Sequence, residues 1–341
     1  MRMLFFEADR MRVWYDACTG KHVRYGVSIK KRLEVLGHHV VLTTRKHPDT
    51  LPLAKFLDEK IVVVGKYNPR SLLTRLRESA QRQLEFSRIF EKKPPDIAIS
   101  HGSVDQCRTA FALRIPIVIT LDTPYAEAVH RLTLPLTDYL VISEAIPEEV
   151  TQVYRVKGEV LSFDGVDEVA WTKNFTPGVR YDFGRPLIVV RQIEEKASYA
   201  REKVNLLALA KQLTRFGKVV FLSRYSHRPT RGLIVPKGFV DSASLVAQAD
   251  LFIGAGGTIT REAALQGTPA IVVKAFPRQH VNDFLSKKGF PIYSAEFSGA
   301  VALAEKLLGK KRDVRHLLVQ LENPVDLIAG IIRKMNGARR L

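Results

Sequence analysis

The chain has 341 residues, is 46% hydrophobic and 26% charged, and carries 53 Lys and Arg residues against 35 Asp and Glu residues, a formal net charge of +18. This composition is typical of a globular protein, and the length suits two domains of ordinary size. The sequence has no apolar run near the ~20 residues that cross a bilayer, and its first ten residues do not resemble a signal peptide. We therefore expect a cytoplasmic protein. The two cysteines, Cys18 and Cys107, lack the spacing of a metal site or a disulfide framework.

Short apolar runs alternate with helical patterns through the first half of the chain. The predicted strands are 12–15, 39–43, 61–64, 97–100, 117–120 and 139–142. The predicted helices are 23–36, 69–91, 104–113 and 146–154. Gly37 ends the first helix as a C-terminal capping glycine does. Residues 1–10 are either an added edge strand or a stretch ahead of a true initiator at Met11, and we favour the second interpretation.

The second half repeats the same alternation. Its predicted strands are 187–190, 219–222, 251–253, 270–273 and 291–293. Its predicted helices are 195–215, 242–249, 258–266, 279–288, 298–309 and 324–335. Nearly continuous Val, Ile and Leu strands that alternate with helices predict an α/β protein whose parallel sheets are covered on both faces.

Residues 163–186 break this pattern, because they hold Gly, Pro and Asp without a clear period. We predict a linker here, between an N-terminal Rossmann-like domain (1–162) and a C-terminal one (187–321). The predicted parallel sheets of the two domains face each other across a cleft. In open α/β sheets, ligands bind at the carboxyl ends of the strands, so the residues that follow each strand are candidates for function.

The basic surface suits nucleic acid, anionic lipid or phosphorylated substrates, and a merely solvated surface is the alternative. The sequence shows no helix-turn-helix, zinc finger or RNP aromatic pattern, which argues against nucleic acid as a partner. Helix 69–91 combines an apolar stripe with arginines elsewhere on its surface. The stripe comprises Leu72, Leu73, Leu76, Ala80 and Leu84, and the arginines are Arg75, Arg82 and Arg88. This helix is a candidate for peripheral contact with a membrane.

The stretch GAGGTITRE, residues 254–262, joins a predicted strand to a predicted helix. Gly254, Gly256 and Gly257 let a ligand approach the backbone closely. The helix that begins near Thr258 offers free N–H groups and the positive end of its dipole, which together form an anion site. Arg261 adds positive charge, and the Glu262 carboxylate can accept hydrogen bonds from a ribose diol. The sequence predicts a nucleotide site; an ordinary tight turn with a capped helix is the alternative.

The stretches TREAALQGTPAIVV and PRQHVND resemble the C-terminal domain of GT-B glycosyltransferases, in particular the lipid II N-acetylglucosaminyltransferase, and the related nucleotide-sugar 2-epimerases. By this resemblance Glu262 holds the ribose of the donor, and Gln279 with Asn282 contacts its sugar. The stretch CTGKHVRY resembles the transferase's TGGH turn, with Lys21 in place of a glycine and His22 on its histidine. The stretch ITLDTPYAEAVHRL resembles the segment that carries an acid, here Asp122.

The whole chain resembles an uncharacterised, largely archaeal GT-B-like family. The matching stretches include VWYDACTGKH, GHHVVLTTR, PPDIAISHGS, LDTPYAEAVHRLTLPLTDYL, GVDEVAW and GAGGTITREAALQGTPAI. The resemblance implies a GT-B fold and a final helix, within 322–341, that packs back on the N-terminal domain.

A glycosyltransferase of this type moves a sugar from a nucleotide-diphosphate donor and must stabilise the charge that grows on the leaving group. The turn at 254–258 and Arg191 are candidates for that role. The sequence has no DxD motif and no clustered carboxylates at metal-ligand spacing, so we expect neither a metal nor another cofactor. The base is His22 or Asp122, with Asp16 as a third candidate, and each could instead be structural.

Other hypotheses remain open at this point. Lys21, His130 and Arg131 are candidates for an anionic acceptor, and the acceptor itself is a glycan or a lipid-linked group at the inner membrane face. An epimerase is an alternative, although its HGD turn appears here as SHGSVD, with Ser103 in place of the acid. A third hypothesis is a GT-B protein that binds a nucleotide or glycolipid without turnover.

Overall fold

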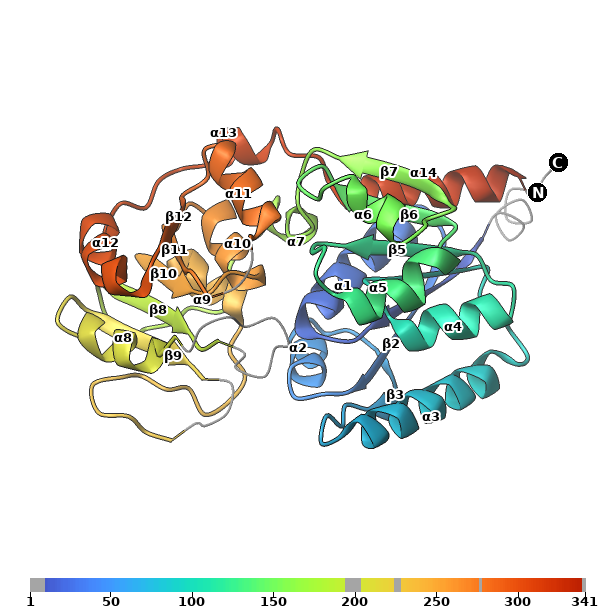
Figure 1. The fold of residues 1–341 in the computed structure, drawn as a ribbon, viewed down its shortest axis with the longest axis horizontal. Coiled ribbons are helices and arrows are strands. Elements are labelled where there is room, and N and C mark those ends of the chain that lie inside the picture. Colours follow the sequence, from blue (N-terminus) through green and yellow to red (C-terminus); the bar gives the residue numbers. More distant parts are fainter. Residues whose placement is uncertain (1–9, 194–203, 224–227, 276–277, 339–341) are drawn as a thin grey trace. The chain divides into compact units, whose positions relative to one another are not determined.

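The computed structural model describes residues 10–193, 204–223, 228–275 and 278–338. Contacts between Cα atoms divide the chain into two compact units (Figure 1). Unit 1 comprises residues 1–171 and 322–341, and unit 2 comprises residues 172–321. The predicted α/β class with two parallel sheets is confirmed. The two interpretations of residues 1–10 stay predictions, because residues 1–9 lie outside the described part.

Unit 1 is built on a seven-stranded parallel sheet in the order β3-β2-β1-β4-β5-β6-β7. The strands are β1 (Arg12–Ala17), β2 (His39–Lys46), β3 (Val62–Lys66), β4 (Ile97–Ser100), β5 (Ile117–Leu121), β6 (Tyr139–Ser143) and β7 (Glu159–Phe163). The order reverses between β1 and β4, and such a switch point is where open α/β sheets bind ligands.

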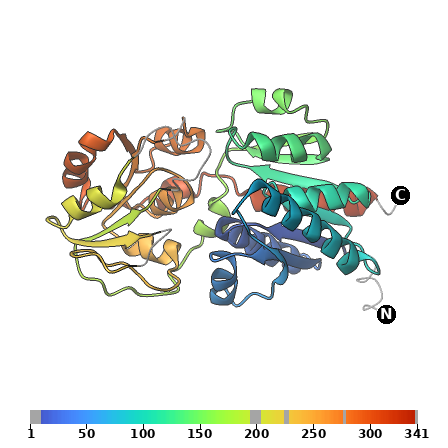
Figure 2. The ribbon, with the colours of Figure 1, turned by 60° about the horizontal axis from the view of Figure 1, so that its bottom comes forward.

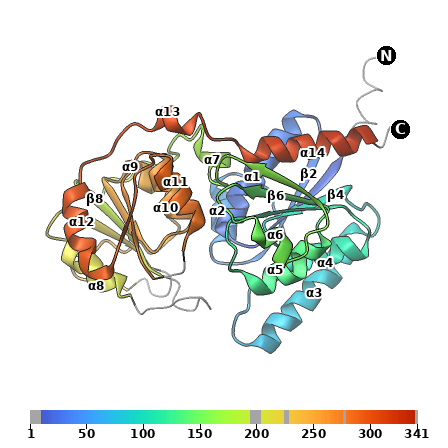
Figure 3. The same cartoon turned by 45° about the horizontal axis from the view of Figure 1, so that its top comes forward.

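Helices cover both faces of this sheet (Figure 2). They are α1 (Gly20–Val35), α2 (Thr50–Phe56), α3 (Leu72–Phe90), α4 (Val104–Ala112), α5 (Glu127–Thr133), α6 (Glu149–Val153), α7 (Val169–Thr172) and α14 (Pro324–Ala338). The last of these, α14, contacts α1, β6 and β7, so the chain returns to unit 1 at its end (Figure 3).

Strand β1 supplies both layers of the core, because successive side chains of a strand point to opposite faces. Val13 and Tyr15 belong to the hydrophobic cluster that includes residues of α1 and α14. Trp14 points the other way, where its ring lies 4.7 Å from that of Phe86 and 4.5 Å from that of Phe90 on α3. Aromatic residues therefore fix the inner face of α3.

Unit 2 has a five-stranded parallel sheet in the order β12-β11-β10-β8-β9. The strands are β8 (Leu187–Arg191), β9 (Lys218–Leu222), β10 (Leu251–Gly254), β11 (Ala270–Val273) and β12 (Ile292–Ala295). The helices are α8 (Leu206–Leu213), α9 (Ser242–Gln248), α10 (Thr258–Leu265), α11 (His280–Lys287), α12 (Ala300–Leu307) and α13 (Arg315–Leu318). Its switch point lies between β8 and β10, next to Gly254.

The structure adds elements that the sequence pattern did not indicate. Strand β7 crosses the predicted domain boundary at 162, and α7 lies inside the predicted linker 163–186. Four short helices were also not predicted, namely α2, α5, α7 and α13. Part of the predicted helix 195–215 falls on 194–203, outside the described residues.

Helix α3 has its predicted apolar stripe in solvent. Of the three arginines predicted elsewhere on the helix, Arg82 is buried, together with Phe86 and Phe90. The Arg82 side chain passes close to Gly65, where an added Cβ would lie 2.4 Å from Arg82 Cγ. Ion pairs with Asp16 and Asp105 hold its guanidinium inside. Among the described residues, no helix combines the length and apolarity of a membrane span.

Candidate active site

A polar cluster forms at the carboxyl edge of the unit 1 sheet, near its switch point. Lys21 lies in the first turn of α1, His101 follows β4 and Asp122 follows β5. Asp167 and Glu168 lie between β7 and α7. Because the strands are parallel, the residues after their carboxyl ends meet at one edge.

Lys21 is the centre of the cluster. Its Nζ lies 2.6 Å from Asp122 Oδ2, 2.7 Å from Asp167 Oδ2 and 3.9 Å from Glu168 Oε1. The side chains of Lys21, Asp167 and Glu168 are nearly buried. The side chain of Asp122 is 20% exposed. Asp122 is therefore the carboxylate of this group that solvent reaches most easily.

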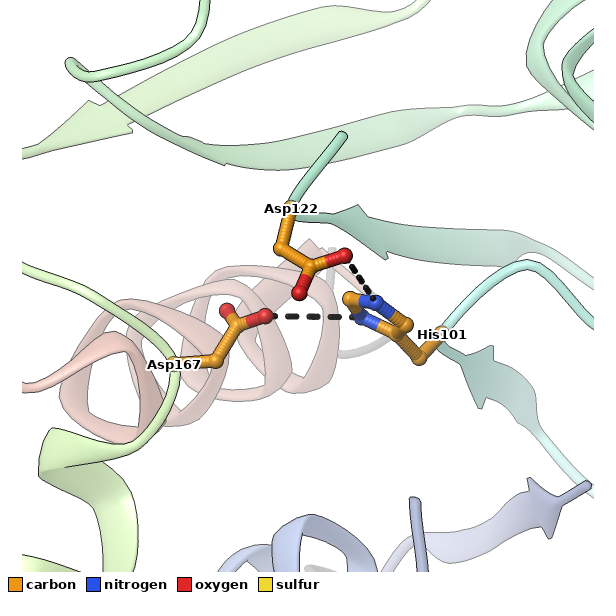
Figure 4. Close-up of side chains that lie close together, drawn as sticks. All are labelled: His101, Asp122 and Asp167. Carbon is orange, nitrogen blue, oxygen red and sulfur yellow. Dashed lines mark hydrogen bonds and ion pairs between the residues drawn. The ribbon is translucent and has the colours of Figure 1, made fainter. Parts of the chain in front are cut away.

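His101 contacts Asp122 and Asp167 through its two ring nitrogens (Figure 4). Its Nε2 lies 3.2 Å from Asp122 Oδ1, and its Nδ1 lies 2.7 Å from the Thr120 hydroxyl and 3.6 Å from Asp167 Oδ2. When neutral, a ring that donates from Nε2 to Asp122 accepts at Nδ1 from Thr120. The two oxygens of Asp122 thus have different partners, Lys21 and His101.

The same residues have the chemistry of a metal site. One ligand atom from each of His101, Asp122 and Asp167 lies within 4.8 Å of the others. The Lys21 ammonium bonds to both carboxylates of that set. In this arrangement Lys21 supplies the positive charge that a cation would bring.

His22 also lies at this edge, with its ring 4.8 Å from that of His101. Its Nδ1 accepts a hydrogen bond from the backbone N–H of Cys18 at 3.3 Å, and the backbone N–H of His22 donates to the Thr19 hydroxyl. Burial, and then the neighbouring His101 and Lys21, lower the pKa of His22 well below its usual value. A neutral His22 bonded at Nδ1 carries its proton on Nε2 and is a donor there.

Asp16, the third candidate base, is fully buried. Its carboxylate accepts from Arg82 at 2.8 and 3.1 Å, from Thr43 at 2.7 Å and from Ser103 at 2.5 Å. These bonds make Asp16 an internal anchor for α3, and its role as a base stays a prediction.

His130 and Arg131, the candidates for an anionic acceptor, lie on α5. Burial is the main cause that lowers the pKa of His130 to about 4, so the ring is neutral and packs against Tyr154. Arg131 is exposed and pairs with Glu127 one turn away. Neither arrangement forms part of the polar cluster around Lys21.

In unit 2, the turn between β10 and α10 has the backbone that the glycine pattern predicts. Gly256 and Gly257 have φ values of +93° and +98°, a region that favours glycine. Gly257 is the N-cap of α10, so the helix begins at Thr258. Arg191, at the end of β8, has its Cβ 3.9 Å from the position of an added Cβ on Gly254.

Gln279 lies against this turn, and Asn282 bonds to Gln279. Gln279 Nε2 donates to the Ala255 carbonyl at 2.6 Å, and Asn282 Nδ2 donates to Gln279 Oε1 at 2.6 Å. An added Cβ on Gly256 would lie only 1.6 Å from Gln279 Oε1. The structure therefore brings together the glycine turn, Arg191, Gln279 and Asn282.

Two other predicted donor residues are turned inward. Glu262 is fully buried, and its Oε2 accepts from the hydroxyl of Ser242 at the start of α9, 2.8 Å away. Arg261 is 5% exposed. The role of Glu262 toward a ribose stays a prediction, and in this arrangement its carboxylate contacts α9.

The sequence prediction missed Asp167 and Glu168 as site residues. It named Lys21 and Asp122, and it contained His101 only within quoted stretches such as SHGSVD, without placing the three together. The available signal was the acidic pair in GVDEVAW, directly after EVLSF, residues 159–163. Had that short segment been identified as a strand, the rule that ligands bind after strand ends would have marked both acids.

Comparison with known proteins agrees with the fold. The model of a family described as "Protein of unknown function (DUF354)" matches residues 11–336. The chain belongs to this family. An uncharacterized protein, MJ0665 of Methanocaldococcus jannaschii, is 29% identical over 338 residues, which cover 93% of this chain and 96% of the relative. The resemblance to an uncharacterised family is thus confirmed.

Solved structures with the same fold include both enzyme classes that the sequence resembles. The UDP-GlcNAc 2-epimerase of M. jannaschii, in complex with UDP-GlcNAc and UDP, has a TM-score of 0.68 at 13% identity and covers 95% of this chain and 100% of its own. The Streptomyces sp. SF2575 glycosyltransferase SsfS6, complexed with thymidine diphosphate, has a TM-score of 0.60 at 16% identity, with 95% and 99% covered. At such identities the likeness shows a GT-B-like fold and no particular activity.

Proposed function

We propose that the protein transfers a glycosyl group from a nucleotide-diphosphate sugar to the hydroxyl of a glycan or lipid-linked acceptor. The observation that supports this most is the state of Asp122, a partly exposed carboxylate held by Lys21 and His101 at the carboxyl edge of the sheet. A base so placed takes the acceptor proton as the new C–O bond forms. Lys21 places a positive charge 2.6 Å from one oxygen of the carboxylate, and His101 fixes its direction.

Unit 2 binds the nucleotide diphosphate in this proposal. The free N–H groups at the start of α10 and the Arg191 guanidinium stabilise the charge of the leaving diphosphate. Gln279, which bonds to the turn, and Asn282, which bonds to Gln279, orient the donor. We assign Glu262 no direct contact with the donor. The buried Arg261 adds positive charge close to the turn.

The test is a thermal-shift screen with nucleoside diphosphates and nucleotide sugars, with and without divalent cation or chelator. A ligand that binds only the folded protein raises the unfolding midpoint by mass action. We expect a shift with one nucleoside diphosphate, reduced in Arg191→Gln and retained in the control Arg215→Gln, an exposed arginine of the same unit. If no nucleotide raises the midpoint, the proposal is wrong.

Epimerisation of a nucleotide sugar is the second candidate. Asp122, Asp167, Glu168 and His101 form a cluster with more proton-transferring groups than one displacement uses. Inverting a carbon that bears hydrogen needs one group to remove the proton and another to return it. In deuterated water without an acceptor, an epimerase exchanges that hydrogen in the recovered nucleotide sugar. Release of diphosphate only when an acceptor is added supports the transferase instead.

A further inference from the structure

The outer face of α3 carries four large apolar side chains in solvent. Leu72 is 81% exposed, Leu73 54%, Leu76 63% and Leu84 47%. Leu76 lies about one turn after Leu72 and Leu73, and Leu84 lies about two turns after Leu76, so the four residues share one side of the helix. The buried side of the helix is already occupied, because Arg82, Phe86 and Phe90 face the core. The leucines therefore cannot turn inward without expelling a buried ion pair.

The charged residues of α3 are divided in the same way. Arg75, Arg77 and Arg88 are exposed, as is Arg70 just before the helix. The acids between them point back to the neighbouring segment: Glu78 pairs with Lys66 at 3.4 Å, and Glu85 accepts from the Gly65 N–H at 3.0 Å. The outward surface of α3 is thus apolar and positive.

We propose that α3 docks unit 1 on a bilayer of anionic phospholipid. The helix has 19 residues and lies on the outside of unit 1, beside β3 at the edge of the sheet (Figures 1 and 3). Leucines inserted below the headgroups and arginines at the phosphates match the way amphipathic helices lie in a membrane interface.

Charge favours an anionic bilayer over a second copy of the chain or nucleic acid as the partner of α3. A second copy of the chain would bring the same arginines against one another, which is repulsive. Nucleic acid would satisfy the arginines but leave the leucines in water, since its backbone offers phosphates and no apolar layer. An anionic bilayer satisfies both groups at once.

The experiment is co-sedimentation of the full chain with vesicles of phosphatidylcholine alone or mixed with phosphatidylglycerol. Two variants test the surface, Leu72→Ser/Leu76→Ser and Arg75→Gln/Arg77→Gln. Their matched controls are Val153→Ser, which replaces a 69% exposed side chain of α6, and Lys306→Gln/Lys310→Gln, which removes two exposed charges of unit 2.

We expect binding to the mixed vesicles that weakens with added salt and is weak on phosphatidylcholine. Each arginine removed lowers the partition coefficient about fivefold, the factor that corresponds to ~1 kcal/mol per charge at such a surface. The leucine variant loses roughly tenfold or more. Both controls keep wild-type binding.

Three results would overturn the docking surface. They are no binding to anionic vesicles, binding that the leucine variant retains in full, or a dimer in sedimentation velocity that the leucine variant dissociates. Binding of duplex DNA that depends on the arginines and not on the leucines, without vesicle binding, assigns the surface to nucleic acid instead. Since no residue of the candidate active site is changed, the result does not depend on the proposed activity.

Discussion

Asp16 and Asp122 are two aspartates of one sheet in opposite situations. Asp16 lies within β1, is fully buried, and accepts hydrogen bonds from Arg82, Thr43 and Ser103. Asp122 comes directly after β5, is 20% exposed, and has Lys21 and His101 as partners. A residue inside a strand points at the covering helices, whereas the residue after its end points at the open edge.

The difference separates a structural carboxylate from a candidate catalytic one. Removing a partner from Asp16 leaves a buried charge unpaired, which is costly. Asp122 can exchange a proton with a ligand because part of it faces solvent. Changing one cluster should therefore alter stability, and changing the other should alter turnover.

The largest expected effect is on turnover. Asp122→Asn keeps the shape of the side chain and removes its basicity, so the proposed activity should fall about 10²- to 10⁴-fold. The free energy of unfolding should change by only about 1 kcal/mol or less, since Lys21 keeps Asp167 as its partner. Steady-state kinetics and urea denaturation measure the two effects. A rise in KM at unchanged kcat would contradict the role of Asp122 as a base.

The next effect is on stability. Arg82→Met leaves the buried Asp16 carboxylate without its cation and should lower the free energy of unfolding by about 3–5 kcal/mol. Arg88→Met is the matched control, because this arginine of the same helix is exposed, and its substitution should cost within about 0.5 kcal/mol. Equal losses in the two variants would mean that the Asp16–Arg82 pair does not anchor α3.

The predicted strands also differ between the interior and the edge of a sheet. Continuous runs such as LIVV and AIVV gave correct strands, because strands covered on both faces are apolar throughout. Strand β7, with the sequence EVLSF, was missed because a polar residue interrupts its apolar run and it lies at the edge of the sheet. Because β7 was not predicted, Asp167 and Glu168 were not recognised as residues that follow a strand.

The burial of Arg82 could not be predicted for a related reason. Nothing local in the sequence shows that Arg82 reaches Asp16, 66 positions earlier. The glycine turn was easier, since Gly256 and Gly257 do adopt positive φ. The burial of Glu262 depends on α9, which a local pattern does not contain.

In unit 2, a pair of glycine substitutions separates backbone strain from contact with Gln279. Both Gly256→Ala and Gly257→Ala place a side chain at positive φ, at a cost of about 1–3 kcal/mol each. Only the first also collides with Gln279, since Gly257 has no heavy atom within 4 Å of an added Cβ.

Gly256→Ala should therefore lower affinity for a nucleoside diphosphate about tenfold more than Gly257→Ala, the effect of losing roughly one hydrogen bond. Isothermal titration calorimetry of both variants gives the comparison. Equal affinities would show that the placement of Gln279 against the turn does not matter for binding.

The smallest effect concerns His22, which lies beside the cluster of Asp122. Burial first, and then His101 and Lys21, hold its pKa well below the ordinary value of 6.5. Below pH 6.5 the unfolded chain therefore binds a proton that the folded protein does not. The stability that neutral His22 contributes is complete above this pH and is lost as the pH falls, by about 1.4 kcal/mol per pH unit.

His22→Gln should remove that slope, so its free energy of unfolding should decline less steeply than that of the wild type between about pH 6.5 and pH 5. His130, whose pKa is lowered to about 4, makes stability depend on pH in the same direction in the wild type and in His22→Gln. The difference between the two curves therefore isolates His22. Parallel curves from denaturation at several pH values would mean that His22 gains its proton as readily in the folded protein as in the unfolded chain. His22 could then serve as a base beside Asp122, and its assignment as a neutral hydrogen-bond donor would be wrong.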